Sequence, residues 1–291
     1  MISGILPVDK PLGWTSHDVV ARVRKLTGQR QVGHAGTLDP LATGVLLVML
    51  GQATRLSSYL MAAPKVYCAE VVLGTYTATD DAEAPAQDVT AVTHVSRTDI
   101  DRCLLSFLGS IRQTPPAYAA VRQGGEKLYK LARTGVLVEP VARQVEVHRI
   151  HIQAWYRPRL MLRIECGSGT YIRSLARDLG AALEVGGYLH GLRRVASGAF
   201  HAEACYTLPE LESVASIEEC LEPLDRAVLQ LPAAVLHTLD AQRVQHGLPI
   251  LAERETDGLV RLYGTEGTLL ALGEAKGRQI KPMRVFNGVR Q

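Results

Sequence analysis

The chain has 291 residues, of which 47% are hydrophobic and 21% are charged, and its formal net charge is +3. This length and composition are ordinary for one large or two smaller globular domains with a sizeable core. No apolar run approaches the roughly 18 residues that a membrane span needs. Asp9 and Lys10 stand where a signal peptide would have its apolar core. We therefore expect a soluble, cytoplasmic protein.

The charges are unevenly distributed along the chain. Residues 111–195 hold fourteen Lys/Arg against six Asp/Glu, whereas residues 61–110 and 196–240 are acidic. Such asymmetry fits a polyanionic partner, nucleic acid first, although charges scattered over unrelated faces would give the same counts. The five cysteines are odd in number and form no C-x-x-C pair, which argues against a disulfide framework and a zinc site.

The first predicted element is a helix within residues 16–27, because apolar residues from Val19 to Leu26 recur at helical spacing. Ser16 is its candidate N-cap, since a serine hydroxyl can accept a bond from a free backbone N–H. Lys10 lies on the turn before this helix. A lone lysine there is either a phosphate contact or, more often, a solvated surface residue.

A glycine-punctuated loop, residues 33–44, leads into an unbroken apolar run, residues 45–50, that predicts a buried strand. The loop carries one histidine, His34, and one carboxylate, Asp39. Pro40 pushes the backbone of Asp39 away from the α region, so the acid has a stiffened support at the end of a core strand. Such a support suits a functional group, although a turn in which Asp39 bonds to its own backbone is the simpler alternative.

The alternation of residues 65–73 predicts a strand that turns Tyr67 inward, either as a core residue or as one that stacks on a base. Short helices are expected at 53–60 and 99–108. Between them, residues 74–98 are polar and acidic, which indicates a solvated loop.

The block 113–145 is basic and interleaves Tyr118 and Tyr129 with its charges, as suits stacking on unpaired bases. An exposed helical hairpin, with a short helix between 126 and 135, would have a similar composition. Further along, strands at 145–152 and 160–166 precede a helix that carries Arg173 in its first turn. Because a helix N-terminus disfavours a cation, Arg173 needs an anionic partner, either a carboxylate of the fold or a phosphate.

Residues 201–235 are acidic and predict helix followed by a linker, and the remainder predicts a small β module. The sequence has no P-loop, dinucleotide-binding or H-E-x-x-H motif.

Six segments of the chain, taken in sequence order, closely resemble the TruB family of tRNA pseudouridine synthases. The match covers nearly the whole chain, and its GHAGTLDP segment is highly specific. It rests on VDKPLGWTS (8–16), GHAGTLDPLATGVL (33–46), KVYCAEVVLG (65–74), QTPPAYAAVRQGGEKLYKLARTG (113–135), GSGTYIRSLARDLG (167–180) and LRRVASGAF (192–200).

The resemblance implies an α+β fold. Residues 1–235 would form a pseudouridine synthase catalytic domain on a large mixed, mostly antiparallel sheet with flanking helices, and 236–291 a small PUA-like RNA-binding module. Residues 113–145 match an insertion that closes on the T loop. The implied reaction is isomerisation of uridine 55 in the T arm of tRNA, with the base flipped out of its stack. The family uses no metal or other cofactor, and we expect a monomer that needs no protein partner.

The resemblance also assigns residue roles. Asp39 matches the essential aspartate, which could attack C1′ of the ribose, attack C6 of the base or remove the C2′ proton. Tyr67 matches the tyrosine that stacks on the uracil and assists loss of the C5 proton. Arg173 matches the arginine that pairs with the aspartate, and this pairing would lower the pKa of Asp39 and keep it ionised.

Three further positions match substrate-binding residues of the family. His34 matches the histidine that meets the flipped or displaced nucleotide, and Leu192 matches an apolar residue that lines the pocket. Lys10 matches a structural or RNA-contact position.

Two alternatives remain open on sequence alone. A guide-RNA-dependent synthase of the dyskerin type shares GHAGTLDP-like motifs but needs partner proteins, and the 113–145 insertion fits the stand-alone enzymes better. A tRNA-binding or tRNA-folding protein without catalysis is the alternative from another class. The presence of Asp39, Tyr67 and Arg173 together argues against it.

Overall fold

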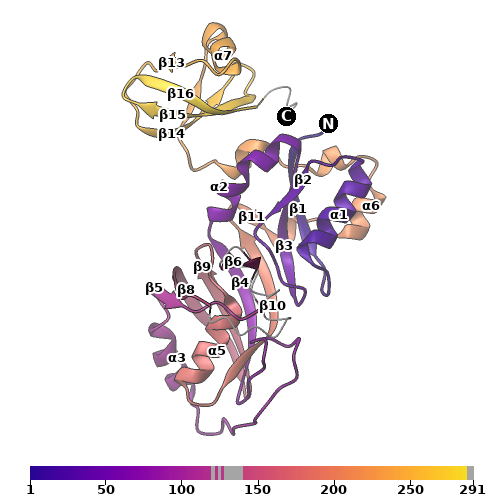
Figure 1. Ribbon diagram of the computed structural model, residues 1–291, viewed down its shortest axis with the longest axis vertical. Coiled ribbons are helices and arrows are strands. Elements are labelled where there is room, and N and C mark those ends of the chain that lie inside the picture. The colour runs from indigo at the N-terminus through magenta and orange to yellow at the C-terminus, as the bar shows by residue number, and fades with distance from the viewer. Residues whose placement is uncertain (119–121, 124–125, 128–139, 287–291) are drawn as a thin grey trace.

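The computed structural model describes residues 1–118, 122–123, 126–127 and 140–286. These residues form a nine-stranded mixed sheet flanked by helices, a two-stranded hairpin and a separate five-stranded sheet near the C-terminus (Figure 1). The prediction of an α+β fold with a large, mostly antiparallel sheet and a C-terminal β-rich module is confirmed.

The strands fall into three groups. The large sheet contains β1 (Gly4–Lys10), β2 (Val32–Ala35), β3 (Ala42–Leu50), β4 (Lys65–Leu73), β5 (Gly109–Gln113), β8 (Arg143–Tyr156), β9 (Arg159–Cys166), β10 (Gly187–Ser197) and β11 (Phe200–His201). The hairpin contains β6 (Arg122–Gln123) and β7 (Glu126–Lys127). The C-terminal sheet contains β12 (Ala233–Val235), β13 (Ile250–Leu251), β14 (Gly258–Tyr263), β15 (Leu269–Lys276) and β16 (Gln279–Val285).

The helices are short, and 3-10 turns supplement them. The α-helices are α1 (Ser16–Thr27), α2 (Ser57–Ala62), α3 (Arg97–Leu105), α5 (Ile172–Ala182), α6 (Leu208–Ser213) and α7 (Thr238–Gln245). The 3-10 helices are η1 (Gly51–Leu56), η2 (Ala202–Ala204), η3 (Ile217–Cys220) and η4 (Leu224–Ala227). None of the helices in the described part of the chain is long and apolar enough to span a membrane.

One parallel strand pair decides where the functional segments meet. The order of the large sheet is β1-β3-β10-β4-β9-β8-β5, with β2 added to β3 and β11 to β10. Every pair is antiparallel except β3 with β10. Strand β10 thereby lies between β3 and β4, with Leu192 opposite Ala42 on one side and Ala69 on the other. The loop before β3 therefore ends close to β4, although the two are separated in sequence.

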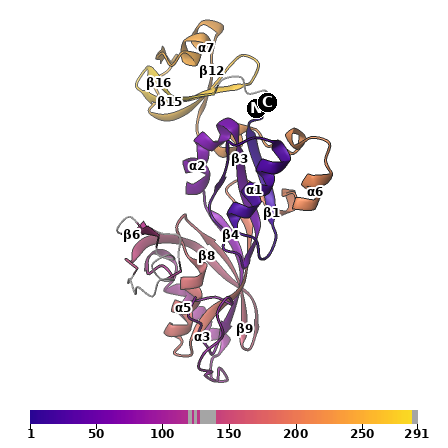
Figure 2. The ribbon, with the colours of Figure 1, turned by 45° about the vertical axis from the view of Figure 1, so that its right-hand side comes forward.

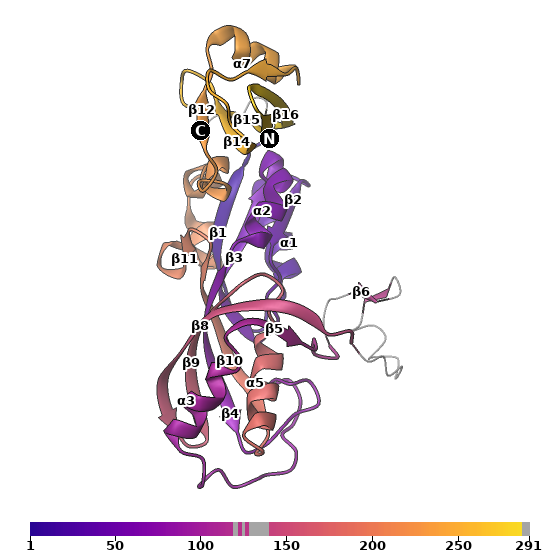
Figure 3. The same ribbon diagram turned by 90° about the vertical axis from the view of Figure 1, so that its left-hand side faces the viewer.

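Strand β3 is buried on both faces, which explains its apolar sequence. Leu46, Val48 and Leu50 point into a core that α1, α3 and α5 cover, and Val45 and Leu47 point into a second core with η1 and α2. Figure 3 shows α1 and α5 on the same side of the sheet. The loop that precedes β3 is therefore anchored to one of the most completely buried strands of the molecule.

The second core continues into the C-terminal module, which Figure 2 shows beyond α2. Phe286 is 2% exposed and packs in the same cluster as Leu56 of η1 and Leu272 of β15. Arg55 donates from Nη1 to the carbonyl oxygen of Val285, and its guanidinium carbon lies 5.6 Å from the centre of the Phe286 ring. The module is thus packed against η1 and the second core of the large sheet rather than joined to them by a linker alone.

Several local predictions are wrong. The N-cap of α1 is Thr15, whose hydroxyl accepts from the N–H of Asp18, because Ser16 turns inward to bond with Leu38. The glycine-punctuated stretch is not all loop, since residues 32–35 pair with β3.

Several helix predictions also differ from the structure. The helix expected at 53–60 is a 3-10 turn followed by the short α2, and the acidic segment 201–235 contains only short helices. The helix expected between 126 and 135 lies outside the described residues from 128 onward, and 126–127 belong to β7. Helix α7 within the C-terminal module was not predicted.

Candidate active site

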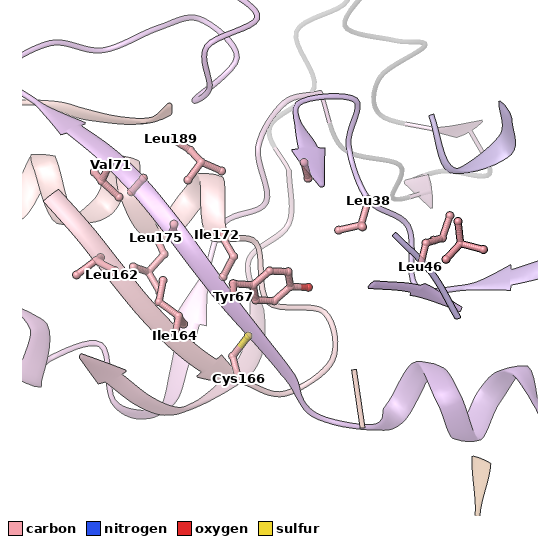
Figure 4. Packing of buried hydrophobic residues seen from close by; sticks show 14 of the residues in the cluster. Leu38, Leu46, Tyr67, Val71, Leu162, Ile164, Cys166, Ile172, Leu175 and Leu189 are labelled. Atoms are coloured by element: carbon pink, nitrogen blue, oxygen red, sulfur yellow. The ribbon is translucent and has the colours of Figure 1, made fainter. Parts of the chain in front are cut away.

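A cleft of about 640 Å³ opens where the loop before β3, strands β4 and β10, and the start of α5 meet. A cleft of this size can hold a nucleoside-sized ligand. Figure 4 shows Tyr67 at the end of a buried row of side chains, with its hydroxyl directed toward Leu38. The cleft lining brings together four predicted site residues from four different segments: Asp39, Tyr67, Arg173 and Leu192.

Asp39 and Arg173 form an ion pair in this cleft, with Nη2 of Arg173 2.9 Å from Oδ2 of Asp39. The Asp39 side chain is 38% exposed, whereas that of Arg173 is 6% exposed. Nη1 of Arg173 lies 3.3 Å from Oδ2 of Asp81, whose side chain is 1% exposed. Arg173 therefore joins an accessible carboxylate to a buried one, and these carboxylates supply its anionic partners at the start of α5.

Asp81 is itself held in place by its own loop. Its Oδ1 accepts a bond of 2.6 Å from the hydroxyl of Thr79 and one of 3.0 Å from the backbone N–H of Glu83. The neighbouring Asp80 pairs with Arg177 of α5 at 2.8 Å. The prediction that this acidic loop is only a solvated surface is thus wrong, because two of its carboxylates fold back onto α5.

The pKa of Asp39 is raised above its ordinary value, because burial in the cleft disfavours the charged form. The guanidinium of Arg173 opposes this rise, and the nearby charge of Asp81 adds to it. The expected lowering of the pKa by Arg173 is present, but burial outweighs it, so the expectation of a lowered pKa for Asp39 does not hold for the net shift. Arg173 supplies a counter-charge, but the desolvating walls and the second carboxylate determine the net direction.

Arg194 lies under the cleft and is 1% exposed. Its Nε donates to the carbonyl oxygen of Val45 at 2.6 Å, and its Nη2 donates to that of Gly36 at 2.9 Å. Arg194 thereby ties the loop that carries Asp39 to β3, and it also interacts with the hydroxyl of Tyr67. Burial raises the pKa of Tyr67 above its ordinary value, so its side chain is a neutral phenol near pH 7.

Lys10 is completely buried, so the prediction of a solvated surface lysine is wrong. Its Nζ donates to the carbonyl oxygens of Pro11 at 3.0 Å, Trp14 at 2.6 Å and Pro40 at 3.4 Å. Burial lowers the pKa of Lys10 to about 8, although the charge of Asp39 opposes the shift. This geometry makes Lys10 a link between the β1–α1 loop and the Asp39 loop, and it leaves no exposed surface for RNA.

His34 lies on β2 in edge contact with His17 of α1, with ring centroids 5.3 Å apart. Burial lowers the pKa of His34 to about 4, and His17 and Arg194 add to the shift, so the ring is neutral near pH 7. Its Nδ1 is buried without a hydrogen-bond partner among the described residues. A neutral ring of this kind can stack on or bond to a nucleotide but is a poor general acid.

The stem of the 113–145 segment is bound to the start of α5. Gln113 donates from Nε2 to the carbonyl oxygen of Tyr171 at 3.0 Å and accepts at Oε1 from the N–H of Tyr171 at 2.8 Å. The carbonyl oxygen of Tyr118 accepts from Nη2 of Arg173 at 3.3 Å. The segment therefore leaves the sheet beside the cleft. Tyr129 lies outside the described residues.

Sequence analysis missed three charged residues at the site: Asp81, Lys65 and Arg194. The sequence does contain a signal for Lys65. It lies two residues before Tyr67 on β4, so the two side chains share the inward face of the strand. Its Nζ donates to backbone carbonyls at the end of α2, and burial lowers its pKa to about 8.

Within the described chain, the fully buried charged side chains are therefore mostly cations: Lys10, Lys65, Arg173 and Arg194, against Asp81. Such an excess of buried positive charge favours an anionic ligand.

Comparison with known proteins agrees with this geometry. The family described as "TruB family pseudouridylate synthase (N terminal domain)" matches residues 24–172. Two C-terminal families, described as "tRNA pseudouridylate synthase B C-terminal domain" and "Pseudouridine synthase II TruB, C-terminal", match residues 173–235 and 232–286. The fold and the site thus define a pseudouridylate synthase, an isomerase. More particularly, the chain belongs to the TruB family.

Full-length relatives are similar over the whole chain. A tRNA pseudouridine synthase B of Thermobifida fusca is 44% identical over 99% of this chain and 100% of its own length. One of Xanthomonas axonopodis pv. citri is 40% identical over 100% of this chain and 96% of its own.

Solved structures show the same architecture. In a Cbf5-Nop10-Gar1 complex, the matching chain has a TM-score of 0.73 and 28% identity, over 97% of this chain and 84% of that one. An H/ACA RNP bound to a substrate RNA containing 2'-deoxyuridine gives a TM-score of 0.72 and 27% identity, over 97% and 84%.

Proposed function

We propose that this enzyme isomerises uridine 55 in the T loop of tRNA to pseudouridine. The observation that carries the proposal is the Asp39–Arg173–Asp81 arrangement: an accessible carboxylate, paired with a buried arginine, at a cleft that also contains Tyr67. The names of the 40–44% identical relatives support tRNA as the substrate. The basic balance of residues 111–195, fourteen Lys/Arg against six Asp/Glu, suits a polyanionic substrate independently.

The uridine would enter the cleft by base flipping. A carboxylate inside this cleft cannot reach C1′ or C6 of a nucleotide that remains stacked in an RNA helix. Extrusion of one base costs a few kcal/mol, and least for a base in a loop. The cleft of about 640 Å³ has room for the extruded nucleoside.

The reaction conserves every atom of the substrate. The bond between N1 and C1′ breaks, the uracil turns, a bond forms between C5 and C1′, the C5 proton leaves, and N1 gains a proton. No oxidant or reductant is therefore required. Asp39 in its ionised form would start this sequence by attack at C1′, attack at C6 or removal of the C2′ proton, while Arg173 holds the carboxylate in place.

The other cleft residues would position the base. Tyr67 would stack on the uracil as a neutral phenol, and Leu192, half-buried on β10, would pack against the ring. The neutral His34, with its unpartnered Nδ1, would meet the displaced nucleotide. We assign no RNA contact to Lys10, since it is fully buried.

We further propose a catalytic domain of residues 1–235 and a PUA-like RNA-binding module of residues 236–291, with β12 at the boundary adding a strand to the sheet of the module. We also propose that the protein is a cytoplasmic monomer that acts without guide RNA. The solved relatives in a Cbf5-Nop10-Gar1 complex and in an H/ACA RNP are 27–28% identical to this chain, whereas a tRNA pseudouridine synthase B reaches 44%.

The test is tritium release from tRNA that carries 5-tritiated uridine, with no other protein or RNA present. Asp39→Asn should abolish release and leave tRNA affinity within about threefold, because the amide keeps the size of the side chain but cannot act as a carboxylate. Asp101→Asn is the matched control, since Asp101 is 56% exposed on α3 and, among the residues that the structure describes, pairs only with Arg97 one turn earlier.

Nucleotide-resolution mapping of the product then locates the modified uridine. Normal release by Asp39→Asn would overturn the mechanism, and a wild-type enzyme that is active only with guide RNA would favour the dyskerin type. Tight tRNA binding without any turnover would favour a folding protein.

A further inference from the structure

The loop between β1 and α1 is bound side by side with the loop that carries Asp39. The N–H of Gly13 donates to the carbonyl oxygen of Pro40 at 2.8 Å. The hydroxyl of Ser16 donates to the carbonyl oxygen of Leu38 at 3.0 Å and accepts from its N–H at 2.9 Å. Trp14 lies between these two connections, which join its loop to the residues on either side of Asp39.

The backbone of Trp14 is fixed from within the protein. The buried Nζ of Lys10 donates to the carbonyl oxygen of Trp14 at 2.6 Å and also reaches that of Pro40 at 3.4 Å. A charged donor of this kind makes a stronger bond than a neutral one. Trp14 is therefore held at a defined place relative to Asp39 instead of standing on a free loop.

The side chain of Trp14 nevertheless reaches solvent. Trp14 is 36% exposed, and Leu12, two residues before it, is 68% exposed, so the tip of this loop is apolar. Trp14 directly precedes the N-cap of α1, where an apolar residue can pack against the fourth helical residue, here Val19. That role needs only an apolar side chain, and it does not explain a large aromatic ring with a third of its surface in water.

We propose that Trp14 is a base-stacking residue for the unpaired RNA nucleotide beside the flipped uridine. The inference rests on the proposed function. When one base leaves the stack, its neighbour loses a stacking partner and presents a bare face at the mouth of the cleft. Aromatic side chains recognise such unpaired bases by stacking, and Trp14 is an exposed aromatic residue whose backbone is fixed beside the Asp39 loop.

Fluorescence tests the contact directly, because the chain contains only two tryptophans, Trp14 and Trp155. The double variant Asp39→Asn/Trp155→Phe binds substrate without turnover and leaves Trp14 as the single reporter. A T-arm hairpin should quench its emission, because the stacked base covers the indole ring. In the matched Asp39→Asn/Trp14→Phe protein, where Trp155 reports from β8, emission should change little. Unchanged Trp14 emission at saturating hairpin, with binding verified by anisotropy of labelled RNA, would overturn the proposal.

Affinity separates stacking from helix capping. Trp14→Phe keeps an aromatic ring and should bind the hairpin within about threefold of wild type. Trp14→Leu keeps only an apolar side chain and should bind roughly 5- to 150-fold more weakly. The melting temperatures of the two variants should agree. Equal affinity of both variants would show that Trp14 serves only helix α1.

Hairpins with one abasic loop nucleotide then identify the stacked base. Removal of that base should weaken binding to the wild-type protein but should not weaken binding to Trp14→Leu any further. If no loop position shows this non-additivity, the proposal fails. Failure of the proposed function is seen separately, as a wild-type enzyme that forms no pseudouridine in the intact hairpin.

Discussion

Asp81 and Asp39 pair with different nitrogens of the same guanidinium: Oδ2 of Asp81 lies 3.3 Å from Nη1 of Arg173, and Oδ2 of Asp39 lies 2.9 Å from Nη2. An arginine paired only with Asp39 would be free to turn with it. Because its Nη1 pairs with a carboxylate that is 1% exposed, the guanidinium is held in one orientation, and this orientation fixes the position of the Asp39 carboxylate. The buried carboxylate is therefore a positioning group for the accessible one.

This relationship predicts that Asp81→Asn reduces the rate of isomerisation by about 100-fold with little change in RNA affinity, because a small displacement of a catalytic group costs about that much. The amide keeps the size of the side chain but loses the charge that faces Arg173. Single-turnover tritium release measures the rate, and filter binding measures the affinity. Asp80→Asn, which alters the next carboxylate and its pair with Arg177, should cost less than a tenth of that effect. Equal losses in the two variants would mean that general disruption of the loop, and not orientation of Arg173, is responsible.

The raised pKa of Asp39 predicts an acid limb in the pH profile. Because the ionised carboxylate is the reactive form, the single-turnover rate should fall as pH decreases through the raised pKa. Asp81 contributes to that rise, so the midpoint of the limb should move to lower pH in Asp81→Asn. A limb that stays in place would remove Asp39 as the titrating group.

The same shift has a consequence for stability. An acid whose pKa is higher in the folded than in the unfolded protein ionises first in the unfolded state as pH rises. The contribution of Asp39 to the free energy of unfolding is therefore largest at acidic pH and declines as pH rises through its folded pKa. Comparison of chemical unfolding of wild type and Asp39→Asn across this range should show the difference between them change in that direction.

The buried position of Lys10 predicts that Lys10→Met lowers the free energy of unfolding by about 2–4 kcal/mol, since three backbone carbonyls lose their donor. Chemical denaturation gives this value. The slope of log affinity for tRNA against log salt should stay as in wild type, because no phosphate contact is removed. A residue that does contact a phosphate would lower that slope by about one upon substitution. A reduced slope in Lys10→Met would therefore show that this lysine reaches RNA.

Local sequence predicts well what neighbours along the chain decide. The strands β3, β4 and β9 follow from apolar runs and alternation, and Arg173 was noticed because a cation conflicts with the start of a helix. These are properties of a few consecutive residues. The inward direction of Tyr67 belongs to the same class.

Local sequence fails where the partner lies far along the chain. Asp81 looks like an ordinary loop carboxylate in the local sequence, because its partner Arg173 lies 92 residues later, on α5. Lys10 looks like an ordinary turn lysine in the local sequence, but it bonds to the carbonyl oxygen of Pro40, 30 residues later. Ser16 does not cap α1 because its hydroxyl makes two hydrogen bonds with the backbone of Leu38. The pKa of Asp39 was misjudged for the same reason, since burial by the whole cleft is not a property of its neighbours in sequence.

The parallel pairing of β3 with β10 predicts that Gly44 cannot be replaced. Gly44 has a φ of +96°, and a Cβ built on it would lie 2.2 Å from the carbonyl oxygen of Arg194 on β10. Gly44→Ala should therefore separate the two strands below the Asp39 loop and lower the free energy of unfolding by about 3 kcal/mol or more. Chemical denaturation measures the loss, and tritium release should fall with it, because Arg194 also holds the carbonyl oxygen of Gly36.

Gly33 provides the control for this change. It lies on β2, paired with β3, and a Cβ there would meet only the end of the Met49 side chain, at 3.9 Å. Gly33→Ala should change the free energy of unfolding by less than about 1 kcal/mol and retain activity. If the two alanine variants are equally stable, β10 does not lie against β3 as closely as the structure has it. The route by which Leu192 and Arg194 reach the cleft would then have to be revised.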